Sequence, residues 1–230
     1  IIKSTIIEDI STEYKIDKDE DIKDIISKMT DEMLKYAADM EFEKINLDTW
    51  QRAPLYTYFM ENMRNVMSMT AEADATRVFR RAEADGLKVY PALTWLVTKT
   101  VNSIENFRYA LAEDGSLIRW KSLSPYFAHF HKEDGNFIKL VCDYDEDVFA
   151  FCARFDRLRE ETKDKKWFEC KFAQKNTFDV TCLPWTHYKS FDVHVFDEGR
   201  YLAPVVSWGR AEERNGRLVL PVSCNIHHAV

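Results

Sequence analysis

Two adjacent histidines, His227 and His228, are the side chains of this sequence best placed to do chemistry. They follow the alternating apolar run Leu218–Ile226, which predicts a β-strand that ends at an imidazole. Histidine titrates near neutral pH, so it can take a proton from a substrate group as a general base. Spacing alone favours a plainer alternative, a hydrogen-bonded histidine at an irregular strand end, and the residues by themselves leave both interpretations open.

Other reactive groups fit known site patterns less well. The close pairs His129/His131 and His227/His228 have no thiols beside them at zinc-like spacing, so no metal site is predicted. Most of the five cysteines stand in apolar, strand-like contexts, which favours buried thiols in a reducing cytosol. There is no G-x-S-x-G elbow, P-loop or G-x-G-x-x-G. The usual support for serine hydrolases, phosphoryl transfer and dinucleotide binding is therefore missing.

Composition predicts a soluble, cytoplasmic globular protein. The 230 residues are 46% hydrophobic and 13% aromatic, enough for one main domain with a sizeable core. A formal net charge of −7 gives no general attraction to nucleic acid or to an anionic membrane. No apolar stretch reaches the roughly 18 residues of a membrane span. We therefore expect neither a nucleic acid nor a membrane as partner.

Charge divides the chain near Met40. Residues 1–39 contain six lysines and eleven acids, so they carry −5 of the net charge. Apolar residues recur there at helical spacing and predict an amphipathic helix: Ile22, Ile25, Ile26, Met29, Met33 and Tyr36. We interpret 1–39 as a charged helical extension or fused segment and 40–230 as the main domain. Docking on its own domain or another copy is favoured over a dedicated binding module.

Periodicity predicts an α+β fold with a large mixed β-sheet flanked by helices. Helical patterns cover 55–64, 75–84, 92–103 and 145–163. Strand patterns dominate later, and the full predicted set is 67–72, 117–120, 126–131, 137–142, 178–183, 191–196, 203–208 and 218–226. Asn215-Gly216 predicts a hairpin turn between Ser207–Ala211 and the last strand.

From about Ile45 onward, the sequence resembles the chloramphenicol acetyltransferase family, because a series of short motifs occurs in the family's order. These motifs are Trp50-Gln51-Arg52, Leu87-Lys88-Val89-Tyr90-Pro91, Asn106-Phe107-Arg108, Phe130-His131, Leu183-Pro184-Trp185, Ser190-Phe191-Asp192, Tyr201-Leu202-Ala203-Pro204-Val205 and Ile226-His227-His228-Ala229-Val230. Each is weak alone, but the ordered set is specific. The resemblance implies the sandwich fold of the CoA-dependent acyltransferases.

The resemblance also implies a mechanism. In the family's closing motif, H-H-x-x-x-D-G, the second histidine is the general base, which corresponds to His228. Thr181 stands where the family has an oxyanion-binding serine, and Ser207 where it has a second hydroxyl, which the resemblance also assigns to binding of the co-substrate. Arg52 matches the arginine that pairs with the motif aspartate. That aspartate would follow Val230, so we expect an acetyltransferase domain that lacks its C-terminal end and an Arg52 without its partner.

Acetyl-CoA is the co-substrate that the resemblance implies. Lys88 and Arg210 match basic positions near the nucleotide phosphates, and Tyr90 and Trp185 match aromatic residues along the pantetheine arm. Ordinary solvated charge explains Lys88 and Arg210 equally well on spacing alone.

For the acceptor, the family's pocket positions form an apolar, aromatic wall suited to a flat ring. They correspond to Tyr58, Phe59, Phe137, Phe191, Val193 and Tyr201, any of which is as well explained by a core role. Departures at Asn65, Met67 and Lys139, where the family commonly has other residue types, put chloramphenicol itself in more doubt than acetyl transfer.

The resemblance therefore implies a homotrimeric, cytoplasmic O-acetyltransferase that inactivates chloramphenicol, with its site between subunits and no metal. Two alternatives remain: acetylation of another small hydroxylated molecule, or a non-catalytic binding or scaffold protein on the same fold. The acyltransferase cores of the pyruvate dehydrogenase type fit less well, because the sequence has no lipoyl domain or Ala/Pro-rich linker.

Overall fold

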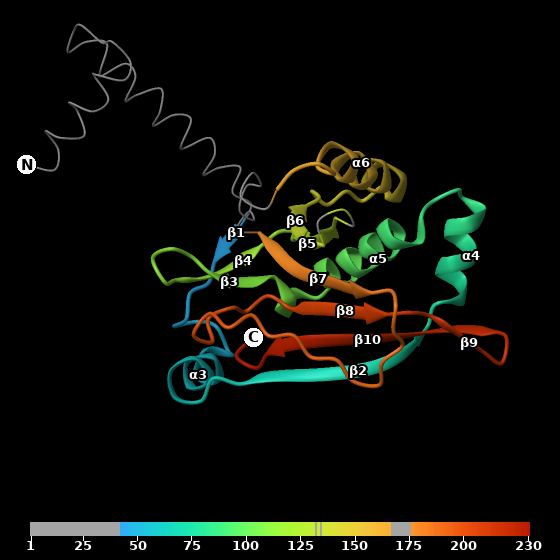
Figure 1. Cartoon of the computed structure of the whole chain (residues 1–230). Helices are drawn as coiled ribbons and strands as arrows, with labels where there is room; N and C mark the ends of the chain where they lie inside the picture. The colour runs from blue at the N-terminus through green and yellow to red at the C-terminus, as the bar shows by residue number, and fades with distance from the viewer. Residues whose placement is uncertain (1–41, 132, 134, 167–175) are drawn as a thin grey trace, which may run out of the picture. The chain divides into compact units, whose positions relative to one another are not determined.

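The computed structural model describes residues 42–131, 133, 135–166 and 176–230. Phe42–Val230 forms one compact unit, which is coloured in Figure 1. The amphipathic helix predicted within 1–39 and the thiol of Cys170 lie outside the described residues.

A large mixed sheet organises this unit (Figure 1). Its strands run in the order β2 (Val66–Asp74), β10 (Arg217–His227), β8 (Val205–Gly209), β7 (Thr177–Leu183), β5 (Ser124–Phe130) and β6 (Phe137–Val141), with β9 (Glu212–Arg214) added beside β10. The pairs β5–β7 and β7–β8 are parallel, whereas the others are antiparallel. A smaller antiparallel sheet joins β1 (Phe42–Lys44), β4 (Leu117–Trp120) and β3 (Tyr109–Leu111).

Helices α5 (Val89–Ser103) and α6 (Val148–Glu161) cover one face of the large sheet (Figure 1). The core between them and the sheet is aromatic: the rings of Phe127 and Phe155 stack at 4.1 Å, and both side chains are fully buried. Asp147 caps α6 by accepting a hydrogen bond from the Phe149 N–H over 2.8 Å. The other helices of the described residues are α4 (Thr76–Ala84), α3 (Ala53–Thr57), a π-helical turn η1 (Tyr58–Asn62) and a 3₁₀ turn η2 (Glu105–Arg108).

The opposite face of the sheet carries most of the polar strand side chains, because strand residues alternate between the two sides and the apolar residues of β7 face the helices. On β7, Phe178 and Val180 are fully buried in the helical core, so Asp179 and Thr181 point the other way. We call this side the polar face, and it is formed by Thr70, Tyr126, Ala128, Lys139, Asp179, Thr181, Ser207, Ser223 and Asn225. The segment between β7 and β8 crosses it: Asn225 Nδ2 donates to the Val193 oxygen, and Tyr188 Oη donates to the Ser207 oxygen over 3.0 Å.

The predicted α+β class with a flanked mixed sheet is confirmed. The hairpin turn is confirmed too, since Asn215 and Gly216 have φ of 53° and 73°, but the strand before it is β9 rather than Ser207–Ala211. The strand predicted over 191–196 is wrong: this segment is irregular. Apolar and polar residues alternate in this segment because it lies on the polar face. Val193 is half-buried there, whereas Asp192 is exposed and accepts a hydrogen bond from Ser68 Oγ over 2.7 Å.

Within the described part of the chain, no helix is long and apolar enough to cross a bilayer.

Candidate active site

His228 stands in the turn that follows β10, beside the η1 turn. The main-chain N–H of His228 donates to the main-chain oxygen of Asn65 over 2.8 Å. Its ring lies against that of Phe59, with centroids 4.3 Å apart. The side chain is half-buried. An aromatic contact on one side and partial exposure on the other leave the imidazole accessible to a ligand while its orientation is restrained.

Arg52, the N-cap residue of α3, holds this turn. Its guanidinium donates to the main-chain oxygens of His228 (3.0 Å), Ala229 (3.3 Å) and Val230 (3.4 Å). The expectation that Arg52 lacks a partner is therefore wrong: three carbonyls satisfy the cation. The sequence motif did place Arg52 at the site, but it contacts the backbone of the motif itself.

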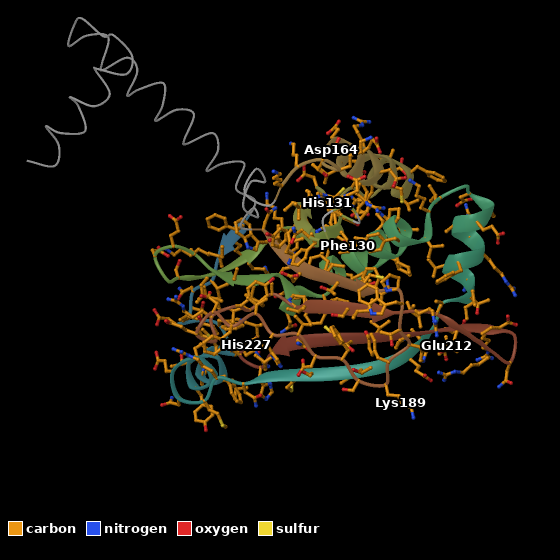
Figure 2. All side chains as sticks on the ribbon, viewed as in Figure 1. Phe130, His131, Asp164, Lys189, Glu212 and His227 are labelled. Atoms are coloured by element: carbon orange, nitrogen blue, oxygen red, sulfur yellow. The ribbon has the colours of Figure 1, made fainter. Side chains whose placement is uncertain are left out.

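His227 has a different environment from its neighbour. Its side chain, labelled in Figure 2, is 2% exposed, and Nδ1 accepts a hydrogen bond from the Ala229 N–H over 3.2 Å. Burial lowers the pKa of His227, and a hydrogen bond with the Gly199 backbone partly offsets this shift. A neutral, buried imidazole with this bond fixes the turn, so His227 is a structural neighbour of His228.

Thr181 and Ser207 belong to a row of hydroxyls on the polar face. Thr181 on β7 is the register partner of Ser207 on β8, which faces Ser223 on β10, which faces Thr70 on β2. The hydroxyls of Thr70 and Ser223 are 2.7 Å apart, and Ser207 is 2% exposed. Thr181 is half-buried and is therefore the member of the Thr181–Ser207 pair that a ligand can reach more easily.

One chain does not bring His228 and Thr181 together. His228 lies five positions beyond Ser223 along β10, about 17 Å in a strand, and Thr181 lies two strands across from Ser223, about 10 Å. By strand rise and strand spacing, the backbone positions of the two residues are thus roughly 19 Å apart, too far for both side chains to contact the same reacting atoms.

Besides Ser207, the residues matched to acetyl-CoA have contrasting surroundings. Trp185, in the turn after β7, is 71% exposed. Arg210 is exposed just beyond β8, and its N–H donates to the Thr186 oxygen over 2.7 Å. Lys88 forms an ion pair of 3.0 Å with Asp156 of α6. Tyr90 faces the helical core, where burial raises the pKa of its hydroxyl.

The acceptor residues occupy two regions. Tyr58 and Phe59 make an edge-to-face pair at 5.2 Å beside His228. The others lie along the polar face: Phe137 is 52% exposed at the start of β6, Phe191 packs on Tyr188 at 5.3 Å, Val193 accepts from Asn225, and burial raises the pKa of Tyr201 beside Asp179. The second region spans the sheet, from Val193 over β10, where Asn225 stands three positions before His228, to Phe137 on β6.

An ion pair on the polar face was not predicted. Lys139 Nζ lies 2.5 Å from Asp179 Oδ1, and 3.9 Å from the centre of the Tyr126 ring. The sequence singled out Lys139 as a departure from the family, but nothing marked Asp179 as its partner. Their separation of 40 residues hides the contact, and the i, i+2 spacing of Asp179 and Thr181 on one strand was the available signal.

Among residues 42–131, 133, 135–166 and 176–230, no three His, Cys, Asp or Glu side chains gather in a metal-like cluster. The rings of His129 and His131 are 5.2 Å apart, and His129 Nδ1 accepts from Arg159 Nε over 3.1 Å. That bond occupies one of the two ring nitrogens of His129 through which an imidazole can bind a metal.

Solved structures define the class of this fold. A chloramphenicol acetyltransferase superposes with a TM-score of 0.72 at 22% identity, covering 82% of this chain and 91% of that chain. The dihydrolipoamide acetyltransferase of Azotobacter vinelandii has a TM-score of 0.57 at 21% identity, over 76% of this chain and 77% of that one. The chain thus has the fold of these acetyltransferases.

Sequence comparison identifies the family within that class. The chloramphenicol acetyltransferase family model matches residues 40–230. The chloramphenicol acetyltransferase of Clostridium perfringens is 30% identical over 83% of this chain and 88% of the relative, and chloramphenicol acetyltransferase 2 of Escherichia coli is 31% identical over 83% and 90%. This chain belongs to the chloramphenicol acetyltransferase family and is an acetyltransferase.

Proposed function

We propose that this protein transfers an acetyl group from acetyl-CoA to a hydroxyl of chloramphenicol, with His228 as the general base. Support comes from the family, whose relatives carry that activity in their names, and from the His228 turn, where Arg52 and Phe59 restrain a half-buried imidazole. An imidazole that is restrained in this way and still reachable is suited to deprotonate a hydroxyl, because histidine is the side chain that most often acts as a general base.

In the proposed reaction, His228 takes the hydroxyl proton while the oxygen attacks the thioester carbonyl carbon. The tetrahedral intermediate carries an oxyanion, to which Thr181 donates a hydrogen bond, with Ser207 beside it. Collapse breaks the carbon–sulfur bond, and the thiolate of CoA takes the proton back from the imidazolium. The products are the acetyl ester and free CoA, with no acyl-enzyme.

The separation of about 19 Å between His228 and Thr181 is the observation that supports a shared site. Both residues act on one intermediate only if they come from different subunits. We therefore propose a homotrimer, in which His228 of one subunit meets Thr181 and the polar face of the next; cyclic symmetry gives three equivalent sites.

The fit of acetyl-CoA rests on the edge of the sheet where β7 and β8 end. Trp185 offers an exposed ring and Arg210 an exposed cation, directly beyond the strands that carry Thr181 and Ser207. Pantetheine can contact an aromatic surface, and a guanidinium can pair with phosphate. Lys88 contributes a second cation once it leaves Asp156. The co-substrate also fits a cytoplasmic protein, in which the free thiols of Cys142, Cys152, Cys182 and Cys224 stay reduced.

The test is thiol release from acetyl-CoA in the presence of chloramphenicol, using the whole chain. We expect His228→Ala to lower kcat by about 10²–10⁴-fold with an unchanged circular dichroism spectrum. His194→Ala is the matched control, because that imidazole is 48% exposed and pairs with Asp192 at the surface. A His228→Ala protein that keeps half its activity would overturn the assignment.

A further inference from the structure

The Lys139–Asp179 ion pair is the feature of the polar face that the proposed function leaves unused. The Lys139 and Asp179 side chains are 19% and 16% exposed, so both are largely withdrawn from water yet still accessible. Such a pair costs desolvation that its mutual attraction barely offsets, and apolar residues of similar volume would serve the fold as well. Its presence therefore calls for an explanation other than stability.

The position of the pair relates it to the reaction. Asp179 lies two residues before Thr181 on the same face of β7, about 7 Å away along the strand. Lys139 is the register partner of Ala128, whose methyl group occupies little of the face between β6 and β7. If a molecule is bound at Thr181, the part of it that points away from Thr181 can therefore contact Lys139 and Asp179.

The pair offers two complementary hydrogen-bonding groups side by side. The ammonium of Lys139 has three N–H donors, of which Asp179 takes one, and the carboxylate of Asp179 has lone pairs on two oxygens. The Tyr126 ring lies under the ammonium, and Tyr201 stands at the Asp179 backbone. Two neighbouring hydroxyls match this arrangement, because one donates to the carboxylate while the other accepts from the ammonium.

Aromatic rings extend the same surface. Phe130 and Phe137 are register partners at the ends of β5 and β6, and they are 58% and 52% exposed; Phe130 is labelled in Figure 2. Phe137 shares its face with Lys139, two residues further along β6. A ring that carries hydroxyls can thus contact the phenyl groups with its apolar side and the ion pair with its polar edge.

We propose that Lys139 and Asp179 bind two neighbouring hydroxyls of the acceptor, so that the site accepts a polyol or glycoside in addition to chloramphenicol. This inference rests on the proposed acetyl transfer, because it assigns the substrate class of the same site. The pair acts by positioning the acceptor and takes no part in proton transfer, which belongs to His228.

The experiment compares two acceptors with acetyl-CoA: methyl glucoside, with its monodeoxy analogues, and chloramphenicol. The double variant Lys139→Met/Asp179→Leu removes the charges at similar volume. We expect kcat/KM for methyl glucoside to fall at least tenfold, mainly through KM, and by a larger factor than kcat/KM for chloramphenicol. Deleting one hydroxyl of the glucoside should reproduce the loss in the unmodified protein and add nothing in the double variant.

Lys99→Met/Glu146→Leu is the matched control. This ion pair has a separation of 3.8 Å, and its two side chains are 50% and 81% exposed. If the double variant fails to fold, Lys139→Gln/Asp179→Asn makes the same test with smaller changes. Equal losses for both acceptors, or no acetylation of methyl glucoside by the unmodified protein, would overturn the inference. If only chloramphenicol is acetylated, the proposed function stands and this inference is overturned. If neither acceptor is acetylated, both the proposed function and this inference are overturned.

Discussion

Arg52 Nη2 donates to the main-chain oxygen of His228 over 3.0 Å, and the two residues are 176 positions apart. The bond ties the start of α3 to the turn after β10, directly beside the Phe59 ring that touches the His228 imidazole. Because one planar cation serves three carbonyls, it restrains the backbone of the whole turn. The direction of the imidazole thus depends on Arg52.

Replacing Arg52 tests this dependence. Arg52→Lys keeps the charge but cannot span three carbonyls, so we expect a loss of about 1–3 kcal/mol in the free energy of unfolding and at least a tenfold fall in kcat. Urea unfolding and thiol-release kinetics measure the two effects. Arg217→Lys, at a side chain 72% exposed, is the control. Full activity in Arg52→Lys would mean that the turn holds its shape without the guanidinium.

Most strands were predictable because the sheet has one apolar face, which produces alternation in the sequence. Strands β1, β3 and β9 were missed because three residues are too short for a periodic signal. The segment 191–196 alternates as well, but its backbone lies across a face instead of pairing at an edge. The periodicity of a sequence indicates which side chains are buried, but it does not show which groups the backbone hydrogen-bonds to.

The site shows the same division. His228 and Arg52 were located by motif, and the structure brings them together. The separation of His228 from Thr181 was beyond the sequence, because it depends on the order of β7, β8 and β10 in the sheet. The ion pair of Lys139 with Asp179 also depends on strand order, since β5 lies between the strands that carry them.

Thr181 supplies a second prediction, about the oxyanion. Thr181→Val removes the hydroxyl at nearly constant volume, and we expect kcat to fall about 10²–10³-fold with little change in KM. Thr181→Ser keeps the hydroxyl and should retain activity within tenfold. Thr100→Val, whose exposed hydroxyl donates to the Leu96 oxygen, is the control. Equal activity of the Val and Ser variants would exclude a hydrogen bond from Thr181 to the intermediate.

Gly209 ends β8 where the Trp185 turn crosses it. A Cβ at this position would lie 2.6 Å from the Thr186 oxygen and 2.9 Å from Pro221 Cγ, so the turn must move to admit alanine. We expect Gly209→Ala to lower the free energy of unfolding by about 1–3 kcal/mol and to raise KM for acetyl-CoA. Ser190→Ala, exposed in the same crossing segment, should change neither value. An unchanged KM would show that the turn does not contact the co-substrate.

His129 should make stability depend on pH. Burial, aided by the Arg159 cation and by His131, lowers the pKa of His129 to about 4 from its usual 6.5. Between these values the unfolded chain binds a proton that the folded chain does not. The contribution of His129 is therefore complete above pH 6.5 and is lost as the pH falls towards 4. We expect the melting temperature of His129→Gln to vary less steeply with pH in that window; identical slopes would contradict this account.

Mixing two inactive variants tests whether the site is shared between subunits. In a trimer built from His228→Ala and Thr181→Val chains, a site is intact wherever the Thr181→Val chain supplies His228 and its neighbour supplies Thr181. Unfolding and refolding an equal mixture should therefore restore activity to about one site in four. Each site needs one particular variant in each of its two subunits, and each subunit is that variant in about half of the cases. Each variant refolded alone stays inactive and is the control. If the refolded mixture were as inactive as the separate variants, the two residues would have to act within one chain, against their separation of about 19 Å.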